Sequence, residues 1–299
     1  QEMMEKWEKP LFDRKNKPFY PEDLVSQHDT LMMPRLEDIR THGKEIHKLL
    51  KDTADNIRPD KKSLQWLAYV DYVNGLIIEG ITKGIICSMN YLADQINIHY
   101  NKQHQQLPIF DIKVDLRDRE VKFDPPIEHT HRNNGIRDII YKIVKDFISL
   151  SIQMFRLDTN QGDYLVEIKD QFEIFGAMQI ITNNLNEMED VAKNFINQYK
   201  DLEFLWKETL MENFHHFLDS GEDPREQTHW KTNADGEQEE DETFKWMADK
   251  ILVGVQTKKP SLELFDEKIS QLSKVKNQIS EMKTQDDIGW LRINCTPLI

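Results

Sequence analysis

The sequence predicts a mainly α-helical fold, an elongated bundle of long antiparallel helices with one inserted β-hairpin at about residues 108–125. Three observations lead to this prediction. Apolar residues recur at three- and four-residue steps along most of the chain, which is the period of an amphipathic helix. Glycine and proline are scarce, at 11 residues each among 299. Charged residues make up 31% of the chain, which suits long helices with solvated faces.

The chain divides into four predicted sections. Its 299 residues are enough for one large or two ordinary domains. The sections are a Pro- and aromatic-rich lead-in at 1–34, a helical bundle containing the β-hairpin at 35–218, an acidic flexible loop at 219–243, and a second helical pair at 244–299 that leads into a further segment.

The lead-in combines prolines with aromatic residues, which predicts a short helix and then an irregular segment held by aromatic contacts. Regular structure is expected to start after Pro34. An apolar stripe then predicts a helix that Pro59 closes, and Ser63 is placed to cap the next helix.

The helix after Ser63 is the strongest signal in the sequence. It keeps one apolar stripe, made of Val70, Val73, Ile77, Ile81, Ile85, Met89, Leu92 and Ile96. Stripes of this period normally pack into a core, so we expect this helix to be buried on more than one side. Gly75, Gly80 and Gly84 each cost up to about 1 kcal/mol relative to Ala in a helix interior, which indicates close contacts or a local irregularity.

The β-hairpin is predicted because the hydrophobic period changes to two between Leu107 and Pro126. Its apolar face must rest on the helices, since a two-stranded ribbon is marginal alone. The helical period returns at Asn134 on a helix that is expected to fray at 158–163. A second long helix is expected from Leu165 toward Leu218.

The last third of the chain begins with a stretch that has no periodicity. Residues 219–243 are acidic and are expected to form a solvated loop. Two helices are predicted after it, at about 241–255 and, after Pro260, at 262–283. The second carries a narrow seam like that of a short coiled coil, made of Phe265, Ile269, Leu272, Val275, Ile279 and Met282.

The composition also bounds the function. A net charge of −14 argues against binding to nucleic acid or to an anionic membrane, so protein partners are expected. Cys87 and Cys295 have no paired spacing, so neither a disulfide framework nor a zinc site is indicated, and a reducing cytosolic compartment fits. The most apolar stretch, 64–98, contains Asp and Lys side chains and is not expected to span a bilayer.

A search for catalytic motifs leaves no site. The sequence lacks GxxxxGK[ST], GxGxxG, GxSxG and HExxH, and two calcium-loop-like stretches fail at required positions. Three Glu-x-x-His pairs occur, a spacing that builds di-iron sites when two pairs face each other in a bundle. The pairs are Glu128 with His131, Glu212 with His215, and Glu226 with His229. Only Glu212 and His215 lie on a convincing helix, so no catalytic, cofactor-binding or metal-binding residue is expected.

Several stretches resemble one protein family in their order along the chain. Residues 69–96 read YVDYVNGLIIEGITKGIICSMNYLADQI, and they are followed by PIFDIKVDL, VKFDPPIE, FISLSIQMFRLD, FLWKETLMENFHHFL and IGWLRINCTPLI, with RLEDIRTHGKEIHKLL upstream. Together they resemble the tail, or stem, of axonemal dynein heavy chains of the outer-arm kind over most of residues 35–299. The chain departs from the family's acidic residue and Arg-Pro after Gly-Trp, where it has Asn294, Cys295, Thr296 and Pro297.

The resemblance implies an internal, non-catalytic piece of a very long heavy chain. It would be a helical scaffold that links the microtubule motor to its docking site in the axoneme of a cilium or flagellum. Implied partners are other dynein heavy chains, WD-repeat intermediate chains, light chains, and docking or assembly factors. ATP and Mg²⁺ would be cofactors of the motor domain of the parent chain only.

Two alternatives stay open at this point. The chain could be a free-standing helical adaptor or tether, which has the same composition. It could also be a helical metal-binding bundle that uses Glu212 and His215.

Overall fold

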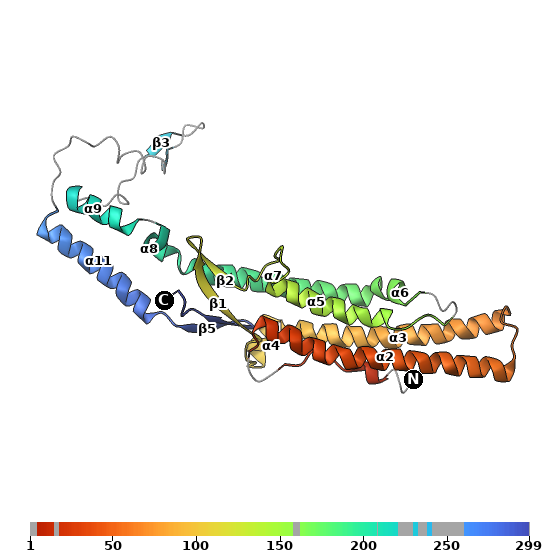
Figure 1. The fold of residues 1–299 in the computed structure, drawn as a ribbon. Coiled ribbons are helices and arrows are strands. Elements are labelled where there is room, and N and C mark those ends of the chain that lie inside the picture. Colours follow the sequence, from red (N-terminus) through yellow and green to blue (C-terminus); the bar gives the residue numbers. More distant parts are fainter. Residues whose placement is uncertain are drawn as a thin grey trace. The chain divides into compact units, whose positions relative to one another are not determined.

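A computed structural model of the chain describes residues 5–14, 18–157, 162–207, 209–220, 230–232, 238–240 and 260–298. The chain forms two compact units, shown with their labelled elements in Figure 1. The first unit comprises Gln1–Leu116, Val121–Ile196 and Thr284–Leu298, and the second comprises Arg117–Glu120, Asn197–Lys283 and Ile299. The predicted mainly helical fold class is confirmed. The four predicted sections stay a prediction.

Helices dominate the described residues. They are α2 (Pro21–Ile57), α3 (Leu64–Gln95), α4 (Ile98–Gln103), α5 (Ile136–Ile148), α6 (Leu165–Lys169), α7 (Phe172–Asn197), α8 (Phe204–Lys207), α9 (Leu210–Ser220) and α11 (Leu262–Glu281), with 3-10 turns η1 (Lys6–Glu8), η2 (Ser149–Ile152) and η3 (Lys200–Leu202). The strands are β1 (Phe110–Arg117), β2 (Glu120–Asp124), β3 (Trp230–Thr232), β4 (Gln238–Glu240), β5 (Gln285–Ile288) and β6 (Leu291–Asn294).

Helices α2, α3, α5 and α7 lie side by side in the first unit (Figure 1). Polar contacts join them at the edges of the apolar core. The Asn184 amide of α7 donates to the carbonyl of Ala93 on α3 over 2.9 Å. On α5, Arg137 pairs with Glu189 of α7 over 2.6 Å.

Helix α2 begins earlier than the sequence predicts. It starts at Pro21 and continues through Pro34, so the expectation that regular structure starts after Pro34 is wrong. Proline suits the first helical position, whereas an interior proline removes a hydrogen bond and costs about 3 kcal/mol. Burial of Leu24 and Met32 on the core face of the first turns offsets that cost. The helix ends before Pro59, as predicted.

Helix α3 is the central core helix that the sequence predicts. The Ser63 hydroxyl accepts a hydrogen bond from the Trp66 backbone N–H over 3.3 Å, so the predicted cap is confirmed. The stripe is buried as well, with Ile77, Ile85 and Met89 each 0% exposed. By length and composition alone, α3 is long and apolar enough to cross a membrane, but more than half of its most apolar stretch is buried inside the protein. The expectation that this stretch does not span a bilayer stays a prediction.

The lead-in packs on α3 through its aromatic residues, as predicted. Trp7, Phe12 and Phe19 are all buried. The backbone carbonyl of Trp7 lies so close to Gly84 that a Cβ atom there would be 2.6 Å from the oxygen. A close contact therefore explains one of the three glycines, while Gly75 has nothing within 4 Å of an added Cβ.

The predicted hairpin is present as β1 and β2, but it belongs to a four-stranded sheet in the order β2-β1-β6-β5. β1 and β6 pair in parallel, with Phe110 opposite Leu291, and β5 and β6 form a second hairpin. Trp290, in the turn between β5 and β6, is fully buried and packs against Phe110 at a ring-centroid distance of 5.8 Å. β5 and β6 were not predicted from the sequence.

The long helices predicted after Asn134 are divided. α5 ends at Ile148 and continues as η2, and the helix expected from Leu165 to Leu218 is broken into α6, α7, η3, α8 and α9. Tyr164, Tyr199 and Leu202 lie at these breaks and are buried. In an uninterrupted helix the direction of each side chain is fixed by the helical period, so the breaks allow these three side chains to reach the core. The prediction of one continuous helix is wrong.

The second unit contains α8, α9 and α11. The Ser261 hydroxyl caps α11 by accepting from the Leu264 backbone N–H over 3.2 Å, directly after Pro260. Within the predicted loop at 219–243, β3 and β4 form an antiparallel pair, so the expectation of no regular structure is wrong for those six paired positions. The helix predicted at about 241–255 lies outside the described residues, as does most of the predicted loop.

Candidate functional site

The candidate metal ligands do not converge in the described part of the chain. Glu212 and His215 lie on α9, and the Glu212 carboxylate accepts from the Thr209 hydroxyl over 2.5 Å. Glu128 lies in the loop before α5 and pairs with Lys193 over 3.3 Å. The pair of Glu226 and His229 lies outside the described residues. Within the described residues, no three His, Cys, Asp or Glu side chains form a group that could hold a metal ion.

Neither cysteine forms a disulfide with another described residue. Burial raises the pKa of the Cys87 thiol, and the nearby Glu8 carboxylate raises it further. A thiol with a raised pKa is mostly protonated at neutral pH and is therefore a poor nucleophile. Cys295 is buried beside the sheet. The nearby Arg35 guanidinium lowers the pKa of Cys87, but by less than burial and Glu8 raise it.

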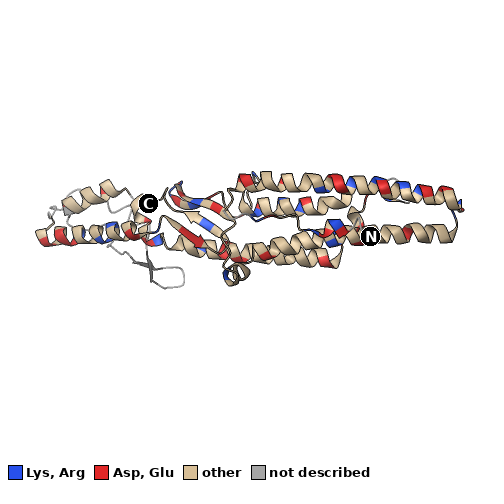
Figure 2. Ribbon diagram, turned by 90° about the horizontal axis from the view of Figure 1, so that it is seen from below, with Lys and Arg blue, Asp and Glu red and all other residues tan. Residues whose placement is uncertain are grey.

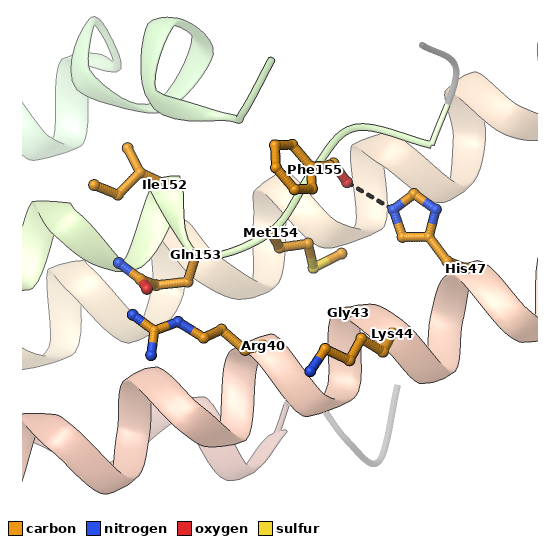
Figure 3. A pocket seen from close by; sticks show the side chains of 8 residues that line it. All are labelled: Arg40, Gly43, Lys44, His47, Ile152, Gln153, Met154 and Phe155. Atoms are coloured by element: carbon orange, nitrogen blue, oxygen red, sulfur yellow. Dashed lines mark hydrogen bonds between the residues drawn. The ribbon is translucent and has the colours of Figure 1, made fainter. Parts of the chain in front are cut away.

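A cavity of about 820 Å³ opens on one side of α2, and we call it the α2 pocket. Figure 3 shows the eight residues that line it. They are Arg40, Gly43, Lys44 and His47 from α2, and Ile152, Gln153, Met154 and Phe155 from the segment after η2. All of them belong to the first unit.

Two contacts hold the two walls of the α2 pocket together, and a third orders the wall after η2. The His47 Nε2 atom is hydrogen-bonded to the Phe155 carbonyl over 2.9 Å, which Figure 3 marks with a dashed line. Met154 is buried against Gly43, where an added Cβ would lie 3.0 Å from the Met154 Cγ atom. The Gln153 amide donates to the Ser149 carbonyl over 2.8 Å. Gly43 therefore lets the segment approach α2 closely, while His47 fixes its backbone.

The α2 side of the pocket is basic. Arg40 forms a pair with Glu37 at 3.5 Å, in which both side chains are substantially exposed. Lys44 is exposed and has no ion pair with any described residue. Figure 2 shows Lys and Arg positions interspersed with Asp and Glu positions along α2, whereas α3 carries few charged residues. The basic side of the pocket is thus a local feature of an acidic chain.

The opposite side of the pocket is apolar. Phe155 is 64% exposed and Ile152 is 48% exposed, although both are large hydrophobic side chains. The pocket therefore presents cations and apolar surface next to each other. The sequence analysis missed this site, although Arg40, Lys44, His47 and Lys51 follow a spacing that puts them on one face of a helix.

A second apolar depression lies within the second unit, between α9 and α11, and we call it the α9–α11 groove. Its volume is about 580 Å³. Its apolar lining residues are Phe204, Leu210, Met211, Phe214, Phe217, Phe265, Ile269, Leu272 and Val275. Phe217 and Phe265 are in contact across it, with ring centroids 6.1 Å apart. Four of the six residues of the predicted coiled-coil seam line this groove, but no described residue of α11 is fully buried.

Comparison with known proteins identifies the relatives of the chain. No family model matches the sequence. The chain is 28% identical to the flagellar outer-arm dynein β chain of Chlamydomonas reinhardtii over 295 residues, which is 98% of this chain and 6% of that relative. It is 22% identical to the ciliary dynein β chain of Heliocidaris crassispina over 301 residues, 99% of this chain and 6% of the relative. It is 24% identical to human dynein axonemal heavy chain 17 over 290 residues, 96% of this chain and again 6% of the relative.

The homologues of this chain are therefore dynein heavy chains, and the chain spans about 6% of the length of the relatives it matches. More particularly, they are axonemal heavy chains of flagellar outer arms and cilia. The resemblance to axonemal dynein heavy chains is confirmed, and these homologues indicate a location in the axoneme of a cilium or flagellum.

Proposed function

We propose that this chain is a non-catalytic section of the stem, or tail, of an axonemal dynein heavy chain. In this role it is a structural scaffold that links the microtubule motor to its docking site in ciliary motility. The observation that carries the proposal is the similarity to axonemal heavy chains over 98% of the chain. The packed helices of the first unit support it, because close-packed interiors have low compressibility and transmit strain.

Catalysis in the whole protein belongs to other regions under this proposal. The parent heavy chain would be a microtubule-stimulated ATPase, with ATP and Mg²⁺ bound in its motor domain. The sequence of this chain has no GxxxxGK[ST] loop, whose backbone amides and lysine hold nucleotide phosphates. The expected contribution of this section is mechanical.

The proposed partners are the other components of an axonemal dynein complex. They are other dynein heavy chains, WD-repeat intermediate chains, light chains, and docking or assembly factors. Large apolar side chains that stay exposed on the helices support a role in assembly, since a protein partner could cover them. Examples on α3 are Leu64, which is 85% exposed, and Tyr72, which is 64% exposed.

Sequencing the transcript for several thousand nucleotides beyond the codon for Ile299 tests the proposal. Repeated GxxxxGK[ST] loops in the same reading frame are the expected result, because they would establish the parent chain as an ATP-driven motor. A stop codon shortly after Ile299 would overturn the proposal and favour a free-standing helical adaptor. As a control on the role of this section, ATP with Mg²⁺ should leave the melting temperature of the 299-residue chain unchanged.

A further inference from the structure

We propose that the α2 pocket binds an acidic peptide segment of a partner protein, in which carboxylates neighbour a large apolar side chain. This inference concerns one surface of the first unit and its ligand chemistry. It stands on the geometry of the pocket, so it does not depend on the stem role proposed above.

The charge of the pocket selects for carboxylates. The chain carries a net charge of −14, yet this surface presents Arg40 and Lys44 side by side on successive turns of α2. Lys44 has no ion pair among the described residues. The pair of Arg40 with Glu37 is exposed on both sides and therefore weak, so a partner's carboxylate can compete for the guanidinium. Both cations are therefore available to an incoming acidic group.

The apolar wall selects for more than a simple anion. Phe155 and Ile152 keep about half or more of their surface exposed, immediately beside the basic residues. A small anion would leave this apolar surface in water, whereas a large apolar side chain of the ligand would remove it from water. The ligand that satisfies both walls carries a carboxylate and an apolar side chain close together.

The size and rigidity of the pocket suit a short segment of peptide. A volume of about 820 Å³ lies within the range of ligand pockets and accommodates several side chains. The hydrogen bond from His47 to the Phe155 carbonyl and the close contact at Gly43 hold the two walls in place. Little ordering of the pocket is then required when the ligand binds.

A protein segment fits better than an extended polyanion. The same stretch of α2 also carries Glu37, Asp38, Glu45 and Asp52. These carboxylates would repel the regular phosphates of a nucleic acid or the anionic headgroups of a membrane. A short acidic segment can place its carboxylates at the two cations and avoid the acidic residues.

Fluorescence anisotropy with two labelled peptides tests the proposal on the 299-residue chain. The probe is a fluorescein-labelled peptide of about eight residues in which Glu alternates with Phe and Leu, and its counterpart has Lys in place of every Glu. We expect the acidic probe to bind and the basic one not to bind. Raising the salt concentration from about 0.05 M to 0.5 M should weaken binding severalfold.

Matched variants locate the binding site. The double substitution Arg40→Glu and Lys44→Glu should weaken binding of the acidic probe at least tenfold. Lys61→Glu with Lys62→Glu makes the same change of charge in the exposed turn between α2 and α3, and should leave binding within about twofold. Circular dichroism of each variant confirms that it is folded.

The apolar wall is tested in the same way. Phe155→Ala should weaken binding about tenfold, because it removes the largest apolar contact of the pocket. Leu107→Ala removes a half-exposed apolar side chain that does not line the pocket, and serves as the control.

Three results would overturn the proposal. The first is that the acidic probe does not bind. The second is equal binding to the charge-reversed pocket variant and to the control variant. The third is binding to phosphatidylserine vesicles in the absence of peptide binding, which would make the surface a membrane contact instead.

Discussion

Adding a methyl group at Gly84 tests whether the lead-in packs on α3 as the structure shows. The Cβ atom of Gly84→Ala would lie 2.6 Å from the carbonyl oxygen of Trp7 and 3.3 Å from its carbonyl carbon. That oxygen also accepts a hydrogen bond from Arg35 over 2.6 Å. Because the obstructing atoms are backbone, the segment that contains Trp7 has to move away from α3.

The matched substitution Gly75→Ala isolates the effect of this clash. Both glycines lie in the interior of α3, so each change to Ala gains up to about 1 kcal/mol from helix propensity. An added Cβ at Gly75 meets nothing within 4 Å, so that variant should be more stable than the wild type. Overpacking at Gly84 costs about 1–3 kcal/mol, and Gly84→Ala should be less stable than Gly75→Ala by that amount.

Urea unfolding of the 299-residue chain, followed by circular dichroism, measures this difference. Limited proteolysis should also cut the lead-in faster in Gly84→Ala, because displaced Trp7 leaves its buried position. Equal stabilisation by the two substitutions, with unchanged proteolysis, would refute the packing of Trp7 on Gly84.

Three further predictions concern the core and its titratable groups. Ile81→Asp should destabilise the first unit by about 4 kcal/mol or more, because Ile81 is 1% exposed and the new charge would have no partner; a variant that melts like the wild type would show that the stripe is exposed. Burial lowers the pKa of His28 by more than the Asp146 carboxylate raises it, so the unfolded chain binds this proton more readily than the folded chain. The urea midpoint should therefore fall as the pH drops below about 6.5. The fall should be smaller in His28→Leu, which has no imidazole to protonate. Although burial alone would raise the pKa of Asp138, hydrogen bonds from Thr130, His129 and Gly135 lower it. The contribution of Asp138 to folding stability is therefore present above about pH 3.9 and is lost as the pH falls through the lowered pKa. Asp138→Asn should cost about 1–2 kcal/mol in urea unfolding at pH 7. An unchanged urea midpoint in Asp138→Asn would contradict a stabilising role for those hydrogen bonds.

Features that depend on local sequence were predicted well. The start of α3 follows from Ser63, whose hydroxyl can reach the backbone N–H three residues later in any helix that begins there. The end of α2 before Pro59 follows from the missing proline N–H and its ring. The hairpin of β1 and β2 is visible because alternation of apolar and polar residues is a property of each strand alone.

Features that depend on distant partners were not predicted. β5 and β6 are four residues each, and they become part of the sheet because β6 pairs with β1, which lies far earlier in the chain. The passage of α2 through Pro34 requires the apolar contacts of Leu24 and Met32. Short strands and helices under strain depend on tertiary contacts that leave no periodic signal.

The candidate interaction surfaces could not be predicted from the sequence, because each is formed by segments that are far apart in the chain. The basic wall of the α2 pocket can be read from the spacing of Arg40, Lys44 and His47, but its apolar wall comes from Ile152 and Phe155, more than a hundred residues later. The coiled-coil seam of α11 was predicted from its period, whereas its meeting with α9 across Phe217 and Phe265 was not.

The sequence by itself determined the mainly helical fold class, the buried stripe of α3 and the kinship to axonemal dynein heavy chains. The helical period, the caps and the order of the motifs are properties of the local sequence, so they can be recognised without knowing the tertiary contacts. Only the tertiary structure decided which strands complete the sheet, where the long helices break, and which basic and apolar side chains face each other in the α2 pocket. Those outcomes depend on packing between residues far apart in sequence, where burial of apolar surface outweighs local preference.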